Sequence, residues 1–207
     1  MFLGNGRVAS VTAEEKETGL LDYQRMTPMS PPAKILGYLF GLPAMEYFMF
    51  SLTLPFLLHC AVVAEIPLLN LLHLYAVFFS SVILYHLTAH VIGMVVSKPR
   101  AASWVARISV LGLYIFLPVL GQAGISFLSF LTIIPTYFGK IIPHLLAEGT
   151  EKLGRFEGQA VAFWQEVPFF TTTVSPTTFT FGMQGLLLLT LFCTAYRKWR
   201  LDSLPAL

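Results

Sequence analysis

The sequence predicts an all-α integral membrane protein. Four transmembrane helices are expected, together with a re-entrant helical pair and an N-terminal amphipathic helix in the cytoplasm. Of the 207 residues, 56% are hydrophobic and only 12% are charged, whereas soluble domains carry about 25% charged residues. Several apolar runs also reach the ~20 residues that a helix needs to cross a bilayer core of ~30 Å. Both observations point to a chain that lies mostly in a membrane.

Four apolar runs are long enough to span, at residues 44–64, 68–96, 104–120 and 177–196. The second run exceeds the thickness of the bilayer core at ~1.5 Å per helical residue, so we expect it to tilt or to extend beyond the membrane. These runs belong to a transmembrane domain at residues 44–207. Two cysteines, Cys60 and Cys193, are expected near opposite faces of the membrane, where they cannot form a disulfide.

A fifth apolar stretch, at residues 124–146, is interrupted by Pro135, Gly139 and Pro143. Proline lacks a backbone donor and clashes with the preceding helical turn, at a cost of about 3 kcal/mol in a helix interior. We therefore expect one short helix to end and another to begin here, each too short to cross the bilayer alone. The stretch is interpreted as an outer gate over a transport path or, alternatively, as a structural plug. An external segment at 147–176 follows it.

The positions of lysine and arginine predict the orientation, because cytoplasmic loops are enriched in basic residues. If the fifth stretch enters the membrane and returns on the same side, the basic clusters before the first span, after the second and after the last all lie in the cytoplasm. These clusters are Arg25 and Lys34; Lys98, Arg100 and Arg107; and Arg197, Lys198 and Arg200. The prediction is a multi-pass protein of the inner (cytoplasmic) membrane with both termini in the cytoplasm.

Residues 1–43 are expected to form a cytoplasmic amphipathic segment. Thr12 and Glu15 have the spacing of a capping box at a helix start, and Pro28 should end that helix. Ser30 is expected to cap a second helix with Pro31 in its first turn. The alternative is a helix that only rests on the lipid surface.

The stretch EKETGLLDYQRMTPMSPPAKILGYLFG, from Glu15 to Gly41, resembles the cytoplasmic segment of the type-two ABC exporter permeases. In that family an acidic run is followed by Thr-Pro-Leu-Ser-Pro and a helix start. The matching residues are Glu15, Glu17, Gly19, Leu20, Asp22, Thr27, Pro28, Ser30, Pro31 and Gly37. The family has six spanning helices, two of them before this segment. The chain is therefore expected to be a fragment, or to be completed by another polypeptide.

The resemblance implies that the segment docks on an ATP-hydrolysing subunit. Residues expected to contact that partner are Glu15, Glu17, Gly19, Leu20, Asp22, Tyr23, Thr27, Pro28 and Ser30. The sequence contains no Gly-x-x-x-x-Gly-Lys-Ser/Thr phosphate loop, so ATP and Mg²⁺ are expected on the partner and no cofactor on this chain. The resemblance further implies a homo- or heterodimer of permease chains in contact with membrane lipid, with no role for nucleic acid.

Histidines provide the alternative interpretations. His86 and His90 are four residues apart on one helix face, a spacing found in zinc-binding helices, but no carboxylate lies nearby in sequence. Helix packing is the preferred interpretation of this pair. His59 and His73 lie near the outer ends of the first two spans, where two level imidazoles could hold a haem. A small membrane redox subunit and a structural scaffold are therefore the alternatives to a permease.

Overall fold

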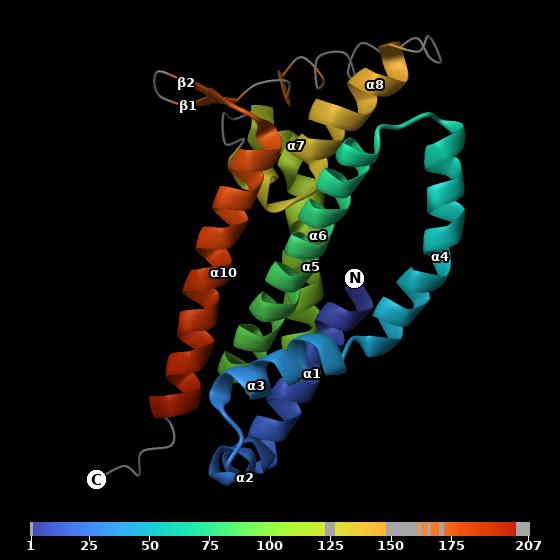
Figure 1. The fold of residues 1–207 in the computed structure, drawn as a ribbon. Coiled ribbons are helices and arrows are strands. Elements are labelled where there is room, and N and C mark those ends of the chain that lie inside the picture. Colours follow the sequence, from blue (N-terminus) through green and yellow to red (C-terminus); the bar gives the residue numbers. More distant parts are fainter. Residues whose placement is uncertain are drawn as a thin grey trace. The chain divides into compact units, whose positions relative to one another are not determined.

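The computed structural model describes residues 2–122, 127–147, 161, 163–164, 167–169 and 172–201. In these ranges the chain is mainly helical, and four helices are long and apolar enough to cross a membrane (Figure 1). This confirms the prediction of a helical membrane protein.

The chain divides into two compact units. The first contains Met1–Ser51, Val82–Ile115 and Leu187–Leu207, and the second contains Leu52–Ser81 and Phe116–Leu186. Each of the four long helices contributes residues to both units, and each unit is described by itself below.

The long helices are α4 (Ala44–Val63), α5 (Leu68–Val95), α6 (Pro99–Gln122) and α10 (Pro176–Leu201). They agree closely with the four predicted spans. The main differences are the start of α6, which lies five residues before the predicted Trp104, and the end of α10, which lies five residues after the predicted Tyr196. Proline is tolerated in the first turn of a helix because no amide donor is needed there.

The N-terminal segment belongs to the first unit and contains α1 (Phe2–Glu17), α2 (Leu20–Met26), α3 (Pro31–Leu36) and the π-helical turn η1 (Gly37–Gly41). Gly19, which separates α1 from α2, has a φ of 75°. Glycine adopts this left-handed conformation without the steric cost that a Cβ atom brings. The chain can therefore turn sharply at that point.

The predicted capping box is wrong. α1 begins at Phe2, so Thr12 and Glu15 lie inside or near the end of the helix and not at its start. The Thr12 side chain is buried against His90, and Glu15 accepts a hydrogen bond from Tyr38. Both side chains therefore contact residues of other elements and do not cap the start of a helix. Pro31 does occupy the first turn of α3 as predicted, but Ser30 makes no side-chain capping bond.

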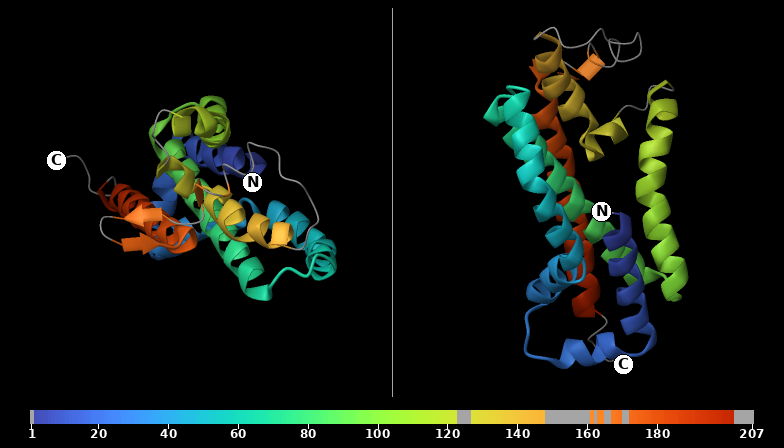
Figure 2. Two further views of the ribbon diagram at one scale, coloured as in Figure 1. Left: turned by 90° about the horizontal axis from the view of Figure 1, so that it is seen from above. Right: turned by 90° about the vertical axis from the view of Figure 1, so that its right-hand side faces the viewer.

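α1 packs against α5 and α6 through small side chains. Figure 2 shows α1 beside the first half of α6 in the right-hand view. The buried residues of this contact are Val8, Ala9 and Ala13 of α1, Ala89 of α5, and Ala102 and Ala106 of α6. Asn5 donates a hydrogen bond to the Ala106 carbonyl at 2.8 Å. Small residues allow helix backbones to approach closely, as is typical of helix packing in membranes.

The broken apolar stretch lies in the second unit. It contains the 3₁₀-helix η2 (Phe127–Leu131), then α7 (Ile134–Thr136), the π-helical turn η3 (Tyr137–Ile141) and α8 (Ile142–Ala147). The start of the predicted stretch, at residues 123–126, lies outside the described residues.

The interruption falls before Pro135, at Thr132 and Ile133, and not between Pro135 and Pro143. Pro135 lies in the first turn of α7, where proline is tolerated. Pro143 lies inside a helical run, directly after the π-helical turn η3. Such local widening of a helix accommodates a proline that has no donor to offer.

The segment after the broken stretch contains structure that the sequence did not predict. Strands β1 (Val167–Phe169) and β2 (Thr172–Val174) pair antiparallel, with Val167 opposite Val174. The sequence predicted only an external segment here, without a hairpin. The Trp164 ring packs edge-on against Phe130 of η2, with ring centroids 5.3 Å apart. Residues 148–160, which carry most of the charges expected in this segment, lie outside the described residues.

Candidate partner-docking site

An apolar patch is exposed on α2 and the turn that follows it. Its residues are Leu20, Tyr23, Met26 and Met29, with exposed fractions of 45%, 64%, 78% and 58%. The sequence identified Leu20 and Tyr23 as contact residues but missed the two methionines, although they continue the same apolar series along the chain. Methionine is frequent at adaptable binding surfaces because its side chain is flexible and polarisable.

The opposite face of the same segment is buried in the first unit. Leu21 is 3% exposed, next to the half-exposed Leu20. The buried cluster combines residues of the N-terminal segment with residues of two membrane helices: Leu21, Ile35, Tyr38 and Leu39 with Leu87 and Met94 of α5 and Ala195 and Trp199 of α10. The segment therefore has one face packed on membrane helices and one exposed face.

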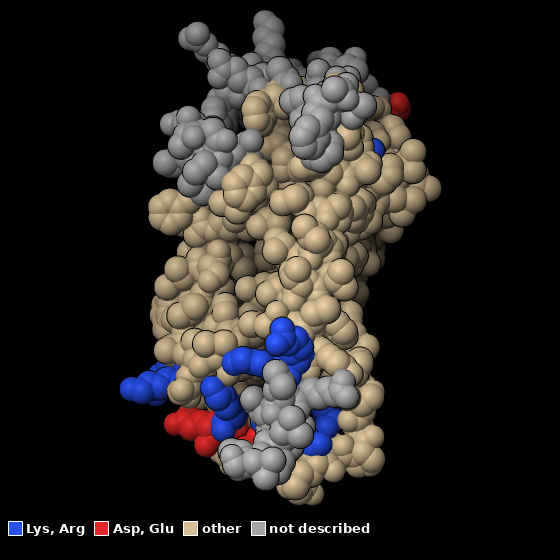
Figure 3. Space-filling view, turned by 90° about the vertical axis from the view of Figure 1, so that its left-hand side faces the viewer, with Lys and Arg blue, Asp and Glu red and all other residues tan. Residues whose placement is uncertain are grey.

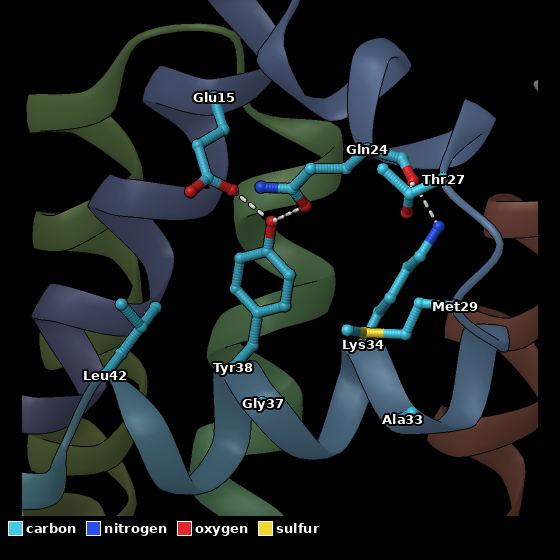
Figure 4. A pocket seen from close by; sticks show the side chains of 9 residues that line it. All are labelled: Glu15, Gln24, Thr27, Met29, Ala33, Lys34, Gly37, Tyr38 and Leu42. Atoms are coloured by element: carbon cyan, nitrogen blue, oxygen red, sulfur yellow. Dashed lines mark hydrogen bonds between the residues drawn. The ribbon is translucent and has the colours of Figure 1, made fainter.

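Tyr38 connects the elements of the segment. Its hydroxyl donates to the Glu15 carboxylate of α1 and lies 2.8 Å from Oε1 of Gln24 in α2 (Figure 4). Burial raises the pKa of the Tyr38 phenol well above its ordinary value, and the neighbouring Glu15 carboxylate raises this pKa further. The phenol thus stays protonated and remains a donor to the carboxylate.

Lys34 is a buried cation, with 8% of its surface exposed. Its ammonium group donates to the Gln24 carbonyl and lies 5.4 Å from the ring centroid of Trp199. Arg25 places its guanidinium 5.6 Å from the same ring. Cation–π contacts of this kind offset part of the desolvation free energy that burying a charge costs.

The Trp199 indole N–H points toward Nε2 of His90, at 3.4 Å, and Nδ1 of His90 lies 3.1 Å from the Thr12 hydroxyl. The Thr12 hydroxyl itself donates to the Val8 carbonyl at 2.8 Å. These contacts fit one tautomer, in which Nδ1 carries the proton and Nε2 accepts. His90 therefore links α1, α5 and α10.

Two lysines meet at the end of α5. Lys16 of α1 and Lys198 of α10 both donate to the Met94 carbonyl, at 2.9 and 3.5 Å. The last carbonyls of a helix lack intrahelical partners and carry partial negative charge. Both lysines therefore supply donors to a carbonyl at the end of α5 and connect α1 and α10 to this helix.

A cavity of about 390 Å³ opens beside the apolar patch, among the nine residues labelled in Figure 4. Met29 contributes to the patch and to the lining of this cavity, while Glu15, Lys34 and Tyr38 form polar parts of its wall. The surface is therefore hollowed next to the patch, where a partner side chain could insert.

The residues predicted to contact the partner divide into two groups. Glu17, Gly19, Leu20, Asp22, Tyr23, Pro28 and Ser30 are exposed. Glu15 and Thr27 are half-buried and make internal hydrogen bonds, to Tyr38 and to the Gln24 carbonyl. Asp22 forms an ion pair with Arg25 at 2.5 Å. Glu15 and Thr27 hold the segment together and do not form its outer surface.

The predicted outer gate lies in the second unit, where its three residues have different environments. Pro135 is buried, whereas Gly139 and Pro143 are half-buried. A Cβ atom at position 139 would lie 2.6 Å from the Trp164 carbonyl oxygen, so only glycine fits there.

A residue that the sequence did not single out, Gln184 of α10, is fully buried in the second unit. Its amide nitrogen donates to the Ser81 hydroxyl of α5 at 2.9 Å and to the Phe130 carbonyl of η2 at 3.3 Å. A lone glutamine within an apolar span was the signal that could have identified it.

The histidines of the alternative interpretations lie in different environments. His86 contacts the Tyr47 hydroxyl at 3.0 Å and His90 contacts Thr12, so the two imidazoles have separate partners. Within the described ranges, no group of three or more metal-ligating side chains occurs. In the second unit, His59 is exposed and Nδ1 of His73 lies 2.8 Å from the Lys140 ammonium. The haem interpretation stays an untested hypothesis.

Comparison with protein-family models, curated proteins and solved structures finds no match to this chain. The functional argument therefore rests on the residues and their geometry.

Proposed function

We propose that the chain is a membrane-embedded permease subunit of an ATP-driven ABC exporter, and that residues 15–31 dock on the ATPase subunit. The observation that carries the proposal is the two-sided character of this segment. Leu20, Tyr23, Met26 and Met29 are exposed on one side, and the other side is packed on α5 and α10. A coupling element needs both, because a force applied by a partner must reach the membrane helices.

Contacts on the buried side of the segment connect the patch to the membrane helices. Tyr38, Lys34 and Arg25 lie against Trp199 of α10, and the Trp199 indole donates to His90 of α5. A displacement of α2 and α3 would therefore act on two membrane helices at once. Under the proposal, ATP and Mg²⁺ are bound by the partner, and closure of that partner supplies the motion.

The charges support a cytoplasmic position for this segment. Ten of the 13 lysines and arginines belong to the first unit: Arg7, Lys16, Arg25, Lys34, Lys98, Arg100, Arg107, Arg197, Lys198 and Arg200. On the face shown in Figure 3, most charged side chains gather over α2, α3 and the C-terminal end of α10. The proposed topology follows from the enrichment of basic residues on the cytoplasmic side: a multi-pass protein of the inner (cytoplasmic) membrane with both termini in the cytoplasm.

The proposal assigns the broken stretch in the second unit to the outer side as a re-entrant gate. Gln184 supports this role because it holds η2 to α5 and α10 through hydrogen bonds. Irregular backbone at membrane depth is tolerated where protein or water surrounds it. Dimer formation is part of the same proposal: only 6% of the apolar window of α4 is buried within the chain, which leaves this helix available to lipid or to a second permease chain.

The test uses cysteine substitution at the exposed Leu20 in native membranes. A short photoactivatable cross-linker on Leu20→Cys should join the chain to a protein that can be labelled with azido-ATP in the presence of Mg²⁺. A charge at the same position, Leu20→Asp, should abolish the co-purification of this protein while membrane insertion persists. A cross-linked partner that binds no nucleotide, or unchanged co-purification with Leu20→Asp, would contradict the proposal.

Leu21→Asp serves as the matched control for the charge. Leu21 is the buried neighbour, so an aspartate there should destabilise the segment itself by leaving an unpaired charge in the cluster. Leu20→Asp should leave the thermal unfolding midpoint of the isolated chain unchanged, whereas Leu21→Asp should lower it. This contrast separates loss of docking from loss of folding.

A further inference from the structure

A second, smaller cavity lies in the first unit, where the first turns of α6 face α1 (Figure 2, right). It has a volume of about 210 Å³ and is lined by Ser10 of α1 and by Pro99, Arg100, Ser103 and Trp104 of α6. It shares no lining residue with the cavity beside the apolar patch, and the role proposed above does not use it.

The two helices are in close contact next to this cavity. A Cβ atom at Gly6 would lie 2.2 Å from Nε of Arg107 and 2.8 Å from Oγ of Ser103. Glycine at this position thus lets both side chains lie directly against α1. One turn further along α1, Ser10 contributes to the cavity, so the contact of the two helices continues directly into it.

One face of α6 concentrates positive charge at this place. Arg100, Ser103, Trp104 and Arg107 recur at the spacing of neighbours on a helix surface. Arg107 Nε is buried and has no hydrogen-bond partner within the described ranges. Among the described residues, no carboxylate forms an ion pair with Arg100 or Arg107. A guanidinium group matches the geometry of a phosphate. Because no described carboxylate pairs with these two groups, a phosphate could bind them.

Apolar surface continues from the cavity along the same helix. Trp104 is 63% exposed, and Val105 and Ile108 after it are 45% and 57% exposed. The apolar span of α6 runs from Pro99 to Leu117, so the arginines stand at its beginning. Tryptophan is enriched where a helix crosses from headgroups into hydrocarbon. The ligand that suits this surface has a negative head and an apolar tail.

We propose that this cavity binds the phosphate headgroup of an anionic membrane phospholipid. Arg100 and the Ser103 hydroxyl contact the phosphate, Arg107 adds a second positive charge two turns beyond Arg100 on the same face of the helix, and Trp104 packs against the part of an acyl chain nearest the headgroup. Basic pockets between helices on the cytoplasmic side are suited to such headgroups. Under the topology proposed above, a bound lipid would connect α1 to α6 at the cytoplasmic surface of the membrane.

The test is native mass spectrometry of the full chain in detergent, titrated with phosphatidylglycerol or phosphatidylcholine of the same acyl length. We expect at least one phosphatidylglycerol to bind about thirtyfold more tightly than phosphatidylcholine, because Arg100 and Arg107 each contribute on the order of 1 kcal/mol, or about fivefold, to the binding of an anionic headgroup. Arg100→Gln should weaken phosphatidylglycerol binding about fivefold by the same relation. Arg100→Lys should retain part of the affinity, since it keeps the charge but loses the planar fork.

Arg197→Gln is the matched control, because Arg197 is an exposed arginine of α10 in the same unit and lies outside the cavity lining. It should leave the lipid affinity unchanged. Arg100 is itself exposed, so its replacement should not disturb folding, and circular dichroism checks this. Equal loss with both variants, or no preference for phosphatidylglycerol, would overturn the proposal. Competition by millimolar glycerol 3-phosphate would also overturn it, since the site would then recognise a soluble anion and not a lipid.

Discussion

The indole N–H of Trp199 donates to Nε2 of His90, with 3.4 Å between the two nitrogens, and the Trp199 ring lies 5.4 Å from the Lys34 ammonium. One side chain near the end of α10 therefore contacts both a membrane helix and the N-terminal segment. Trp199 is only 3% exposed, so its loss should release the segment from the membrane helices.

This relationship predicts that Trp199→Leu exposes the segment to protease. Lys34 would lose its cation–π contact and about 1–2 kcal/mol of stabilisation. We expect trypsin cleavage after Lys34 in detergent to accelerate at least about fivefold. Trp104→Leu is the control, because Trp104 lies on the exposed face of α6. If both variants are cleaved as slowly as the original chain, the segment is held by other contacts.

Tyr38→Phe should destabilise the segment by about 2 kcal/mol, the typical value of a hydrogen bond to a charged group. The effect should depend on pH. The folded chain holds the Tyr38 pKa above its ordinary value of 10.0, so this stabilisation is complete below about pH 10 and is lost as the pH rises further. The difference in unfolding midpoint between the original chain and Tyr38→Phe should thus stay constant up to about pH 10 and shrink at higher pH.

Tyr23→Phe provides the control for this pH series, since Tyr23 belongs to the exposed patch. It should change the unfolding midpoint very little at every pH. A constant difference between the original chain and Tyr38→Phe across the series would show that the hydroxyl of Tyr38 contributes no proton-linked stability.

Gly139→Ala should destabilise the second unit. The added methyl group would lie 2.6 Å from the Trp164 carbonyl oxygen and 3.3 Å from Pro176 Cγ, and overpacking of this kind costs about 1–3 kcal/mol. Gly182→Ala is the matched control, because a Cβ atom there would meet nothing within 4 Å. Thermal unfolding should separate the two variants, and equal midpoints would mean that η3 and Trp164 separate readily.

The proposed topology predicts opposite labelling of two exposed serines. In a background without Cys60 and Cys193, Ser97→Cys after α5 should react with a membrane-impermeant maleimide only in inside-out vesicles. Ser175→Cys before α10 should react only in right-side-out vesicles or cells. Both serines are exposed, so burial does not explain a difference. Labelling of both from the same side would exclude the re-entrant arrangement.

The four membrane helices could be predicted because length and apolar composition alone determine whether a helix can cross a bilayer. α1 could not be predicted from Phe2 onward, since its first residues include Gly4, Asn5 and Gly6, which have low helix propensity. These residues are helical because they pack on α5 and α6, and those partners lie far away in the sequence. Local spacing therefore suggested a helix start at Thr12, where the structure has a buried contact.

The candidate docking site was predicted in outline, and the missed parts have physical reasons. The resemblance placed Leu20 and Tyr23 among the expected contact residues, and both are exposed. No local pattern distinguishes Glu15, which bonds to Tyr38, from the exposed Glu17. Likewise, prolines in the broken stretch predicted an interruption but not its position. A π-helical turn before Pro143 lets the helix continue, and such turns have no signal in the sequence.

Gly93 restricts how the N-terminal segment can move. A Cβ atom at this position of α5 would lie 2.6 Å from the Ala9 carbonyl oxygen and 2.6 Å from Cβ of Thr12. Helix α1 therefore cannot slide along α5, because a shift of one residue would place a side chain where only hydrogen fits. A displacement of α2 must either carry α5 with it or be absorbed by rotation at Gly19, where the left-handed backbone interrupts the helix. Under the proposed function, rotation at Gly19 would reduce the part of the ATPase movement that reaches α5.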